Sequence, residues 1–260
     1  MTRLAANISW MFTEMPFEQR FTAAASAGFE YVEWNYAFDF TKERLRNLLE
    51  ANSLALTLIN VSGGDMSSGE LGLAALPGRQ ADAAAAFAQA LDYATALDAR
   101  LVHFLAGKPP PGMESEAADA VFLENLCQSA DIAASAGVTL TLEPLNPRDR
   151  AGYHLMSATH ATRLIRSSQR SNIKLQLDVY HQQMHGGNVL QTIEENFEYL
   201  AHVQLAGVPG RHEPDTGELN HTAILSKLDE LGYTGVVGCE YAPIGRTSAG
   251  LNWAQPYLNI

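Results

Sequence analysis

Residues 138–143, Val138-Thr139-Leu140-Thr141-Leu142-Glu143, form a short apolar run that ends in a carboxylate. The pattern recurs three times, in runs that end at Asp178, Gln204 and Glu240. We interpret each run as a buried strand. The four polar residues are 35, 26 and 36 positions apart. Each interval is close to the ~30 residues of one strand and its crossover helix, so the runs predict neighbouring parallel strands.

Apolar runs alternate with helical patterns along the rest of the chain. Four more strands are predicted at residues 4–9, 29–34, 54–60 and 101–105. Helices are predicted at residues 15–28, 41–49, 80–98, 115–136, 188–200 and 222–231; another begins at Ser157 or Thr159, and a last helical stretch ends near Tyr257. Strict alternation is typical of a parallel sheet covered by helices. Eight units of about 32 residues predict an α/β protein with a single (β/α)8 TIM-barrel domain over residues 1–260.

A doubly wound open sheet is the alternative architecture. Its dinucleotide-binding form carries G-x-G-x-x-G after the first strand, and this chain has no such motif there. In a barrel, catalytic residues lie at the C-terminal ends of the strands, which is where the four polar residues fall.

Glu143, Asp178, Gln204 and Glu240 would then project from the same ends of neighbouring strands. Three carboxylates and an amide form an oxygen-rich cage, which hard divalent cations such as Mg²⁺ or Mn²⁺ prefer. Such a cation polarises adjacent carbonyl and hydroxyl oxygens and stabilises an enediolate. A carboxylate beside the substrate carbon can serve as a base, with its pKa raised by enclosure. The alternative is that these are solvated loop residues, which four successive strand ends disfavour.

Three further residues are candidates for binding substrate. His181 follows the sixth predicted strand, and we expect it on the loop over the pocket. Arg211 is the best candidate to hold an anionic group bidentately, and Lys108 is a weaker one because surface lysines are usually solvated. Residues 61–77, rich in Gly and Ser, predict an active-site loop or lid, with a passive surface loop as the alternative.

Two polar residues on other predicted strands have simpler interpretations. We interpret His103, at the end of the fourth strand, as an inward histidine with satisfied hydrogen bonds. Glu33, near the end of the second strand, is either a partner of the cage or a structural residue, and the sequence does not separate these roles.

Charge and cysteine content narrow the class of protein. The formal net charge is −12, with 29 acidic and 17 basic residues, which disfavours binding to nucleic acid or anionic lipid but allows a small anionic substrate. Cys127 and Cys239 predict buried free thiols and a reducing compartment. The N-terminal residues lack the apolar region of a signal peptide, and no apolar run is long enough to cross a membrane. We expect a soluble, cytoplasmic protein.

Longer motifs carry a family resemblance that runs nearly from end to end. They are residues 5–9, 76–79, 142–146, 177–181, 202–206, 211–218 and 238–241. With these motifs the chain resembles the hydroxypyruvate isomerase family, within the xylose isomerase-like barrel superfamily that also holds tagatose and psicose epimerases and endonuclease IV. Residues 11–17 and 202–207 are most similar to the 2-oxotetronate isomerase branch.

The resemblance implies an isomerase that converts hydroxypyruvate to tartronate semialdehyde, or 2-oxotetronate to 3-oxotetronate. It implies one divalent metal ion held by Glu143, Asp178, Gln204 and Glu240, with Glu143 and Glu240 as the proton donor and acceptor. The segment after Glu143, residues 146–149, is variable in character, so substrate preference is not transferred through it. A homo-oligomer is expected by analogy alone.

Three alternatives stay open at this point. A ketose 3-epimerase or an inosose-type lyase uses the same cage, but such sites often carry His where this chain has Gln204. A DNA-repair enzyme related to endonuclease IV needs a histidine-rich zinc cluster and a basic face, which the net charge of −12 and the oxygen-rich cage oppose. A non-catalytic binding barrel would be expected to lack a member of the cage.

Overall fold

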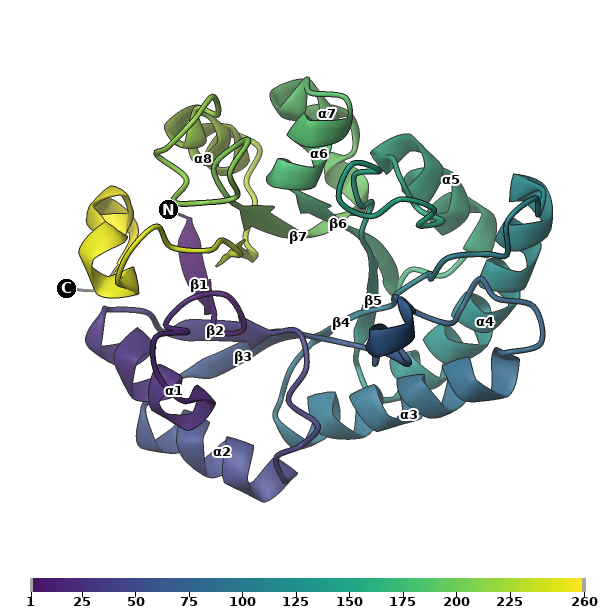
Figure 1. The fold of residues 1–260 in the computed structure, drawn as a ribbon, viewed down its shortest axis with the longest axis horizontal. Coiled ribbons are helices and arrows are strands. Elements are labelled where there is room, and N and C mark those ends of the chain that lie inside the picture. Colours follow the sequence, from purple (N-terminus) through teal and green to yellow (C-terminus); the bar gives the residue numbers. More distant parts are fainter. Residues whose placement is uncertain (1, 259–260) are drawn as a thin grey trace.

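Eight parallel strands pair in chain order and close into a barrel in the computed structural model of the chain (Figure 1). The structure describes residues 2–258. Strand β8 pairs with β1 and closes the ring. The strands are β1 (Arg3–Asn7), β2 (Tyr31–Trp34), β3 (Ala55–Asn60), β4 (Leu101–His103), β5 (Thr139–Leu142), β6 (Ile173–Asp178), β7 (Leu200–Leu205) and β8 (Val236–Cys239). The predicted (β/α)8 TIM barrel is confirmed.

Helices surround the barrel on its outside (Figure 1). They are α1 (Phe17–Ser26), α2 (Lys42–Ala51), α3 (Gln80–Ala96), α4 (Ser115–Ser135), α5 (Ala158–Ser168), α6 (Val179–His185), α7 (Val189–Glu195) and α8 (His221–Glu230). Four short 3-10 helices complete the described elements: η1 (Met66–Ser68), η2 (Phe197–Tyr199), η3 (Thr247–Gly250) and η4 (Asn252–Tyr257). No helix in residues 2–258 is both long and apolar enough to cross a membrane.

Side-chain caps explain why two helices begin where the sequence predicts. The Thr41 hydroxyl accepts a hydrogen bond from the Arg44 N–H at 3.2 Å, and the Ser157 hydroxyl accepts one from the His160 N–H at 3.2 Å. Each bond satisfies one of the N–H groups that the first turn of a helix leaves without a partner. Ser157, rather than Thr159, is therefore the cap of α5.

The sequence prediction is wrong in the region around β6 and β7. The Asp178 carboxylate accepts a hydrogen bond from the Tyr180 N–H at 2.9 Å, so the last residue of β6 also caps α6. No turn residues separate this strand from its helix, and α6 was therefore missed. The helix predicted over residues 188–200 is shorter, because α7 ends at Glu195 and the chain passes through η2 into β7. At the C-terminus the prediction is confirmed, because the last helical stretch, the 3-10 helix η4, ends at Tyr257.

Alternation along the strands separates an apolar shell from a polar barrel interior. Leu140 and Leu142 of β5, and Leu175 and Leu177 of β6, are at most 1% exposed and belong to the apolar core. The residues between them are polar, and their side chains meet: the Thr141 hydroxyl donates to the Gln176 carbonyl at 2.8 Å. Because successive side chains point to opposite faces of a strand, the other face of each strand supplies the interior of the barrel.

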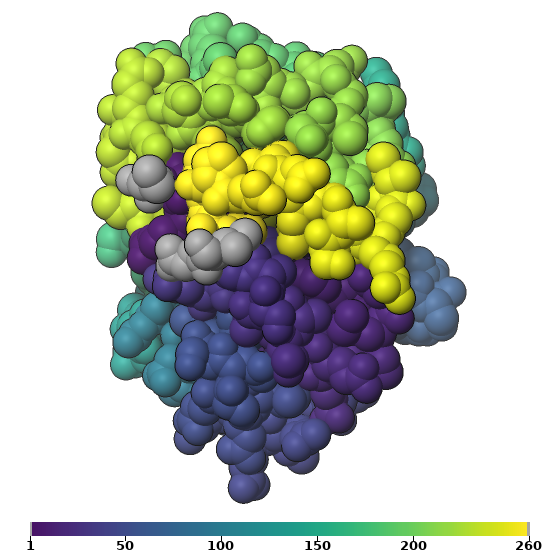
Figure 2. Space-filling view, turned by 90° about the vertical axis from the view of Figure 1, so that its left-hand side faces the viewer, coloured from purple at the N-terminus to yellow at the C-terminus, as the bar shows by residue number. Residues whose placement is uncertain are grey.

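The C-terminal segment covers the seam between the first and last units of the barrel. Figure 2 shows it, in yellow, between the green and purple parts of the surface. The Thr247 hydroxyl accepts a hydrogen bond from the Phe12 N–H at 2.7 Å, and the Thr247 N–H donates to the Glu14 carboxylate at 3.0 Å. These contacts tie the segment after β8 to the loop after β1.

Candidate active site

The four predicted cage residues lie together at the rim where β5 to β8 end. Asp178 is the last residue of β6, and its Cα pairs in register with that of Gln204 in β7. Glu143 directly follows β5 and Glu240 directly follows β8. Their exposed fractions are 5% for Glu143, 1% for Asp178 and Gln204, and 6% for Glu240. The alternative of solvated loop residues is therefore wrong for all four.

A small cavity lies at this rim. Its volume is about 80 Å³, and about 10–15 Å³ on this scale already holds one water molecule. A ligand of a few heavy atoms suits this space. The lining residues come from the C-terminal ends of all eight strands and the segments that follow them: Trp10, Asn35, Tyr36, Asn60, Met66, Leu71, His103, Leu105, Glu143, Leu145, Arg150, His181, Arg211 and Glu240. Met66 and Leu71 belong to segment 61–77, which therefore contributes to the cavity as an active-site loop.

Arg211 is the cation at the centre of the cage. Its guanidinium Nη2 lies 2.7 Å from Asp178 Oδ2 and 3.4 Å from Glu240 Oε2. The guanidinium carbon also lies over two aromatic rings, 4.5 Å from the centroid of Trp10 and 4.8 Å from that of Tyr180. Aromatic faces attract a guanidinium, so both rings help to hold the Arg211 side chain in place.

Burial and mutual repulsion dominate the electrostatics of the cage carboxyl groups. Burial raises the pKa of Glu143 well above its ordinary value, and the charges of Glu240 and Asp178 raise it further. Burial also raises the pKa of Glu240, to about 8, although Arg211 opposes the shift. The pKa of Asp178 is raised by burial as well, against the lowering effect of Arg211. One guanidinium therefore does not compensate the charge of three buried carboxylates.

A polar layer inside the barrel orients the cage from below. The Gln176 amide Nε2 donates to Gln204 Oε1 at 2.7 Å and to Glu143 Oε2 at 3.1 Å. The Gln204 amide Nε2 donates to Glu33 Oε1 at 2.8 Å. The donor end of the Gln204 side chain is thus bound to Glu33. Its carbonyl oxygen accepts the bond from Gln176 and keeps a second lone pair for another partner.

Glu33 is the anchor of this layer. It is fully buried and accepts hydrogen bonds from Asn7 Nδ2 at 3.1 Å and His202 Nε2 at 2.7 Å in addition to Gln204. Gly238 makes room for it: a Cβ at this position would lie 2.4 Å from Glu33 Oε1. Glu33 is therefore a partner of the cage, a role that the sequence left open. Gln176 was missed, although it lies two residues before Asp178 and so shares its strand face.

His181 faces the cage from α6, not from a loop as predicted. Its ring nitrogen Nδ1 lies 3.2 Å from the Asn146 N–H, which donates to it, and 2.7 Å from the Asn146 amide nitrogen. With Nδ1 as acceptor, the neutral ring carries its proton on Nε2. Nε2 lies 3.7 Å from Asp178 Oδ2. Burial lowers the pKa of His181 well below its ordinary value, and Arg211 lowers it further.

His103 is inward and neutral, but it is not satisfied as predicted. Burial lowers its pKa to about 3. Its Nδ1 lies 3.2 Å from Glu143 Oε2 without hydrogen-bond alignment, and neither ring nitrogen has a hydrogen-bond partner among residues 2–258. A buried polar group without a partner is costly in a protein interior, and this one lines the cavity. His103 is therefore available to bind a ligand.

Of the two basic residues predicted to bind substrate, Arg211 and Lys108, only Arg211 lies at the cavity. Arg211 is at the cage, whereas Lys108 is absent from the residues that line the cavity. Arg150 lines the cavity instead and was missed. It belongs to the segment after Glu143, and a loop position of this kind has no strand or helix periodicity that would reveal its direction.

We expect the stability of the metal-free protein to fall as the pH rises from about 7 to 8. Because the pKa of Glu240 is about 8 in the folded state and ordinarily 4.5, the folded protein binds more protons than the unfolded chain in this range. The resulting stabilisation is complete below pH 4.5 and is lost as the pH rises through 8. Urea unfolding in EDTA at the two pH values measures the change. Constant or rising stability would contradict it, and Glu240→Gln should flatten the dependence.

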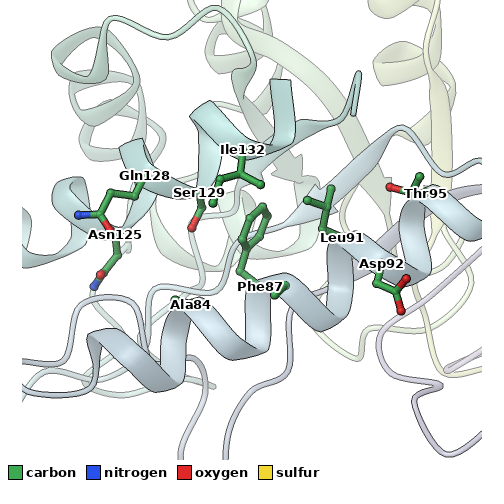
Figure 3. A pocket seen from close by; sticks show the side chains of 10 residues that line it. Ala84, Phe87, Leu91, Asp92, Thr95, Asn125, Gln128, Ser129 and Ile132 are labelled. Atoms are coloured by element: carbon green, nitrogen blue, oxygen red, sulfur yellow. The ribbon is translucent and has the colours of Figure 1, made fainter. Parts of the chain in front are cut away.

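A larger cavity, of about 370 Å³, lies on the outside of the barrel between α3 and α4 (Figure 3). Its walls include the apolar side chains of Phe87, Leu91 and Ile132. The acidic residue there, Asp92, is paired with Lys42 at 2.5 Å. This surface has no convergent set of titratable groups, so the smaller cavity at the strand ends is the candidate active site.

Comparison with known proteins agrees with this geometry. A family model described as "Xylose isomerase-like TIM barrel" matches residues 21–257. The chain belongs to this family. Among curated relatives, a protein of Cupriavidus necator named "2-oxo-tetronate isomerase" is 43% identical over 99% of both chains. The "Hydroxypyruvate isomerase" of Escherichia coli K12 is 38% identical over 99% of this chain and 100% of its own. The predicted membership of the hydroxypyruvate isomerase family is confirmed, and the protein is an enzyme of the isomerase class.

Solved structures of this barrel family support the same fold. The crystal structure titled "AP endonuclease, family 2" from Brucella melitensis has a TM-score of 0.97 and 42% identity, with full coverage of both chains. A D-psicose 3-epimerase from Clostridium cellulolyticum H10 has a TM-score of 0.78 at 19% identity, with full coverage of both chains. The epimerase likeness shows the shared barrel alone.

Proposed function

We propose that this isomerase moves the carbonyl group of a short 2-oxo acid by proton transfer through an enediolate, with one divalent cation in the cage. The two substrate candidates are hydroxypyruvate and 2-oxotetronate. The observation that carries the proposal is the pair Glu143 and Glu240, two buried carboxyl groups with raised pKa values that line a cavity of about 80 Å³. A pKa near the working pH is what a general acid or base requires.

The donor set fits a hard divalent cation such as Mg²⁺ or Mn²⁺. Glu143, Asp178 and Glu240 supply carboxylate oxygens, and Gln204 supplies a carbonyl oxygen whose amide end is held by Glu33. Their buried negative charge exceeds what Arg211 compensates, as the raised pKa values show. When bound, the cation would polarise the adjacent carbonyl and hydroxyl oxygens of the substrate and favour the enediolate.

Glu143 and Glu240 carry the protons in this proposal. One removes a proton from the hydroxyl-bearing carbon, and the electron pair moves to form the enediolate. The other gives a proton to the adjacent carbon, and the hydroxyl proton passes to the former carbonyl oxygen, which leaves the carbonyl group shifted by one position. The neutral ring of His103 has free nitrogen atoms at the cavity wall and can hydrogen-bond a substrate oxygen. The four buried side chains around the cage limit the water that reaches the reacting carbons.

Arg211, His181 and Arg150 would orient the carboxylate of the substrate. All three line the cavity, and Asn146 fixes the proton of His181 on the nitrogen that faces inward. A neutral sugar has no use for two arginines in so small a space, whereas a short acid does. This is why the acid, and not a ketose, is the proposed substrate class. Lys108 has no place in this arrangement.

Arg211→Lys is expected to weaken substrate use by about 10²-fold in kcat/KM, mainly through KM. Lysine lacks the planar fork that contacts the faces of Trp10 and Tyr180 and that can bind Asp178 and a substrate carboxylate together. Losing a buried charged hydrogen bond costs ~2–5 kcal/mol, and each 1.4 kcal/mol is tenfold. Steady-state kinetics would show it. Arg170→Lys, at a surface pair with Asp131, is the matched control. An unchanged KM would remove Arg211 from substrate binding.

A substrate panel tests the proposed function directly. Hydroxypyruvate, 2-oxotetronate and a ketohexose would each be incubated in D₂O with Mg²⁺ or Mn²⁺, and NMR would follow both product formation and deuterium entry at carbon. We expect conversion of one or both acids with deuterium in the product, and no reaction of the ketohexose. Turnover of the ketohexose alone would favour an epimerase.

DNA repair is the second candidate, because the Brucella melitensis structure is titled as an AP endonuclease. The net charge of −12 opposes a DNA-binding face, since phosphate contacts require clustered Lys and Arg. The cage is also dominated by oxygen donors rather than histidines. Cleavage of DNA that contains an abasic site, in the same buffer as the substrate panel, would favour DNA repair over the isomerase reaction.

A further inference from the structure

Asp119, His154 and His160 form a second group of metal-ligating side chains, outside the barrel. Asp119 lies in α4, His160 in the first turn of α5, and His154 in the segment that connects β5 to α5. The helices α4 and α5 contact each other on the outside of the barrel (Figure 1). None of the three residues lines the active-site cavity. The proposed reaction therefore gives these three residues no role.

The three ligand atoms converge on one point. His154 Nε2 lies 2.9 Å and His160 Nε2 2.7 Å from the same oxygen, Asp119 Oδ1. One available atom from each residue lies within 4.8 Å of the others. Two imidazoles and a carboxylate are ligands that Zn²⁺ takes in proteins, with a fourth position left for water. We propose that this group is a Zn²⁺ site, separate from the barrel cage.

The adjustment required for Zn²⁺ is small. Bonds of ~2.0–2.1 Å place the vertices of a tetrahedron about 3.4 Å apart. The ring nitrogen of His154 must therefore move about 0.5 Å, and that of His160 about 0.7 Å, away from Asp119 Oδ1. Each ring must also present an unprotonated Nε2, with its proton on Nδ1. Arg163 supports the geometry, because its Nη2 donates to Asp119 Oδ2 at 2.6 Å and leaves Oδ1 toward the rings. Such outer contacts commonly orient ligating carboxylates.

The burial of these three side chains also favours binding of Zn²⁺. The side chains of Asp119 and His154 are 7% and 5% exposed, and that of His160 is 16% exposed. The ligand atoms are thus largely removed from competing water, while the edge at His160 gives a cation access from solvent. The rings pack edge to face with centroids 5.1 Å apart, which holds both Nε2 atoms in the same region.

A cation here would clamp the active-site segment after β5 to α4. The His154 N–H donates to the Gly107 carbonyl at 2.9 Å, which ties the same segment to the loop after β4. Upstream in the segment, Asn146 fixes His181 and Arg150 lines the cavity. The site would therefore stabilise the loop that carries these residues, without contact with the substrate.

Zinc titration of the purified chain tests the proposal. In excess Mg²⁺, calorimetry should show that His154→Gln and His160→Gln each bind one Zn²⁺ fewer per chain than the wild type. The loss of affinity at this site should exceed the ~10–100-fold expected for a residue that only hydrogen-bonds to a metal ligand. The exposed His185→Gln is the matched control and should keep the site. Zn²⁺ should also raise the Tm of the wild type and of His185→Gln but not of His160→Gln.

A second measurement needs no variant. Crystals of the wild type grown with Zn²⁺ should show an anomalous peak between α4 and α5 in contact with Asp119 Oδ1 and both rings. Equal zinc stoichiometry in wild type and His160→Gln, or no anomalous density at the cluster, would contradict the zinc site. Asp119, His154 and His160 would then only hydrogen-bond α4 to the segment before α5 and to α5 itself. Turnover of short 2-oxo acids is a separate readout, so failure of the zinc site and failure of the proposed reaction are distinguishable.

Discussion

Glu240→Gln is expected to lower kcat by about 10²–10⁴-fold, the usual contribution of a positioned general acid or base. Glutamine has nearly the same shape and keeps an oxygen toward the cage, but it cannot accept or release a proton. Glu240 is buried at the cavity, and its pKa of about 8 makes both protonation states available near neutral pH. Steady-state conversion of hydroxypyruvate, followed by NMR, measures the loss.

The control for this variant must separate chemistry from folding and metal binding. Glu230→Gln replaces an exposed glutamate of α8 that pairs with Lys227 and should leave kcat unchanged. Retained Mn²⁺ binding by Glu240→Gln would show that the cage still forms. Near-normal turnover of Glu240→Gln would eliminate the proposal that two carboxyl groups carry the protons.

Deuterium exchange assigns the two carboxyl groups to separate steps. If Glu240 removes the first proton, Glu240→Gln should fail to exchange the hydrogens at C3 of hydroxypyruvate with D₂O. Glu143→Gln should then still exchange them but form little product, because the protonation of C2 is blocked. The reverse pattern would assign Glu143 as the base. Exchange and product formation at wild-type rates in either variant would contradict its role.

The strand ends could be predicted from the sequence because their signal is local. Each of Glu143, Asp178, Gln204 and Glu240 follows an apolar run, and parallel strands bring their C-terminal ends to one rim. The structure places Asp178 and Gln204 in register, as this argument requires. The repeat length alone was therefore enough to bring together residues almost a hundred positions apart.

The polar interior could not be predicted in the same way. Thr141, Gln176 and His202 interrupt apolar runs, and their importance appears only when four strands from different parts of the chain are joined by hydrogen bonds. Barrel interiors are usually filled by branched apolar side chains, so a polar layer is a departure from the local rule. Arg150 was missed for a different reason, because it lies in a loop whose path is set by tertiary contacts.

Removal of divalent cations with EDTA is expected to reduce turnover to the background of the assay, and Mn²⁺ or Mg²⁺ should restore it. Glu143, Asp178 and Glu240 are buried with raised pKa values, and Arg211 alone does not compensate their charge. Without the cation, the carboxyl groups hold protons, and the substrate oxygens lose the charge that polarises them. Full turnover in EDTA, after removal of trace metal, would contradict the cage as a metal site.

The affinity for Mn²⁺ should depend on pH, because the cage carboxyl groups hold protons when no cation is bound. A ligand must lose its proton before it binds a cation, so metal binding and protonation of Glu240 compete. Below pH 8, near the pKa of Glu240, the apparent affinity should rise about tenfold per pH unit for each proton displaced, and it should level off above that pH. Calorimetry in buffers of different ionisation enthalpy would count the protons released. Glu240→Gln should make the dependence shallower, whereas Glu230→Gln should not. An affinity that does not change with pH would mean that the cation binds away from the buried carboxyl groups.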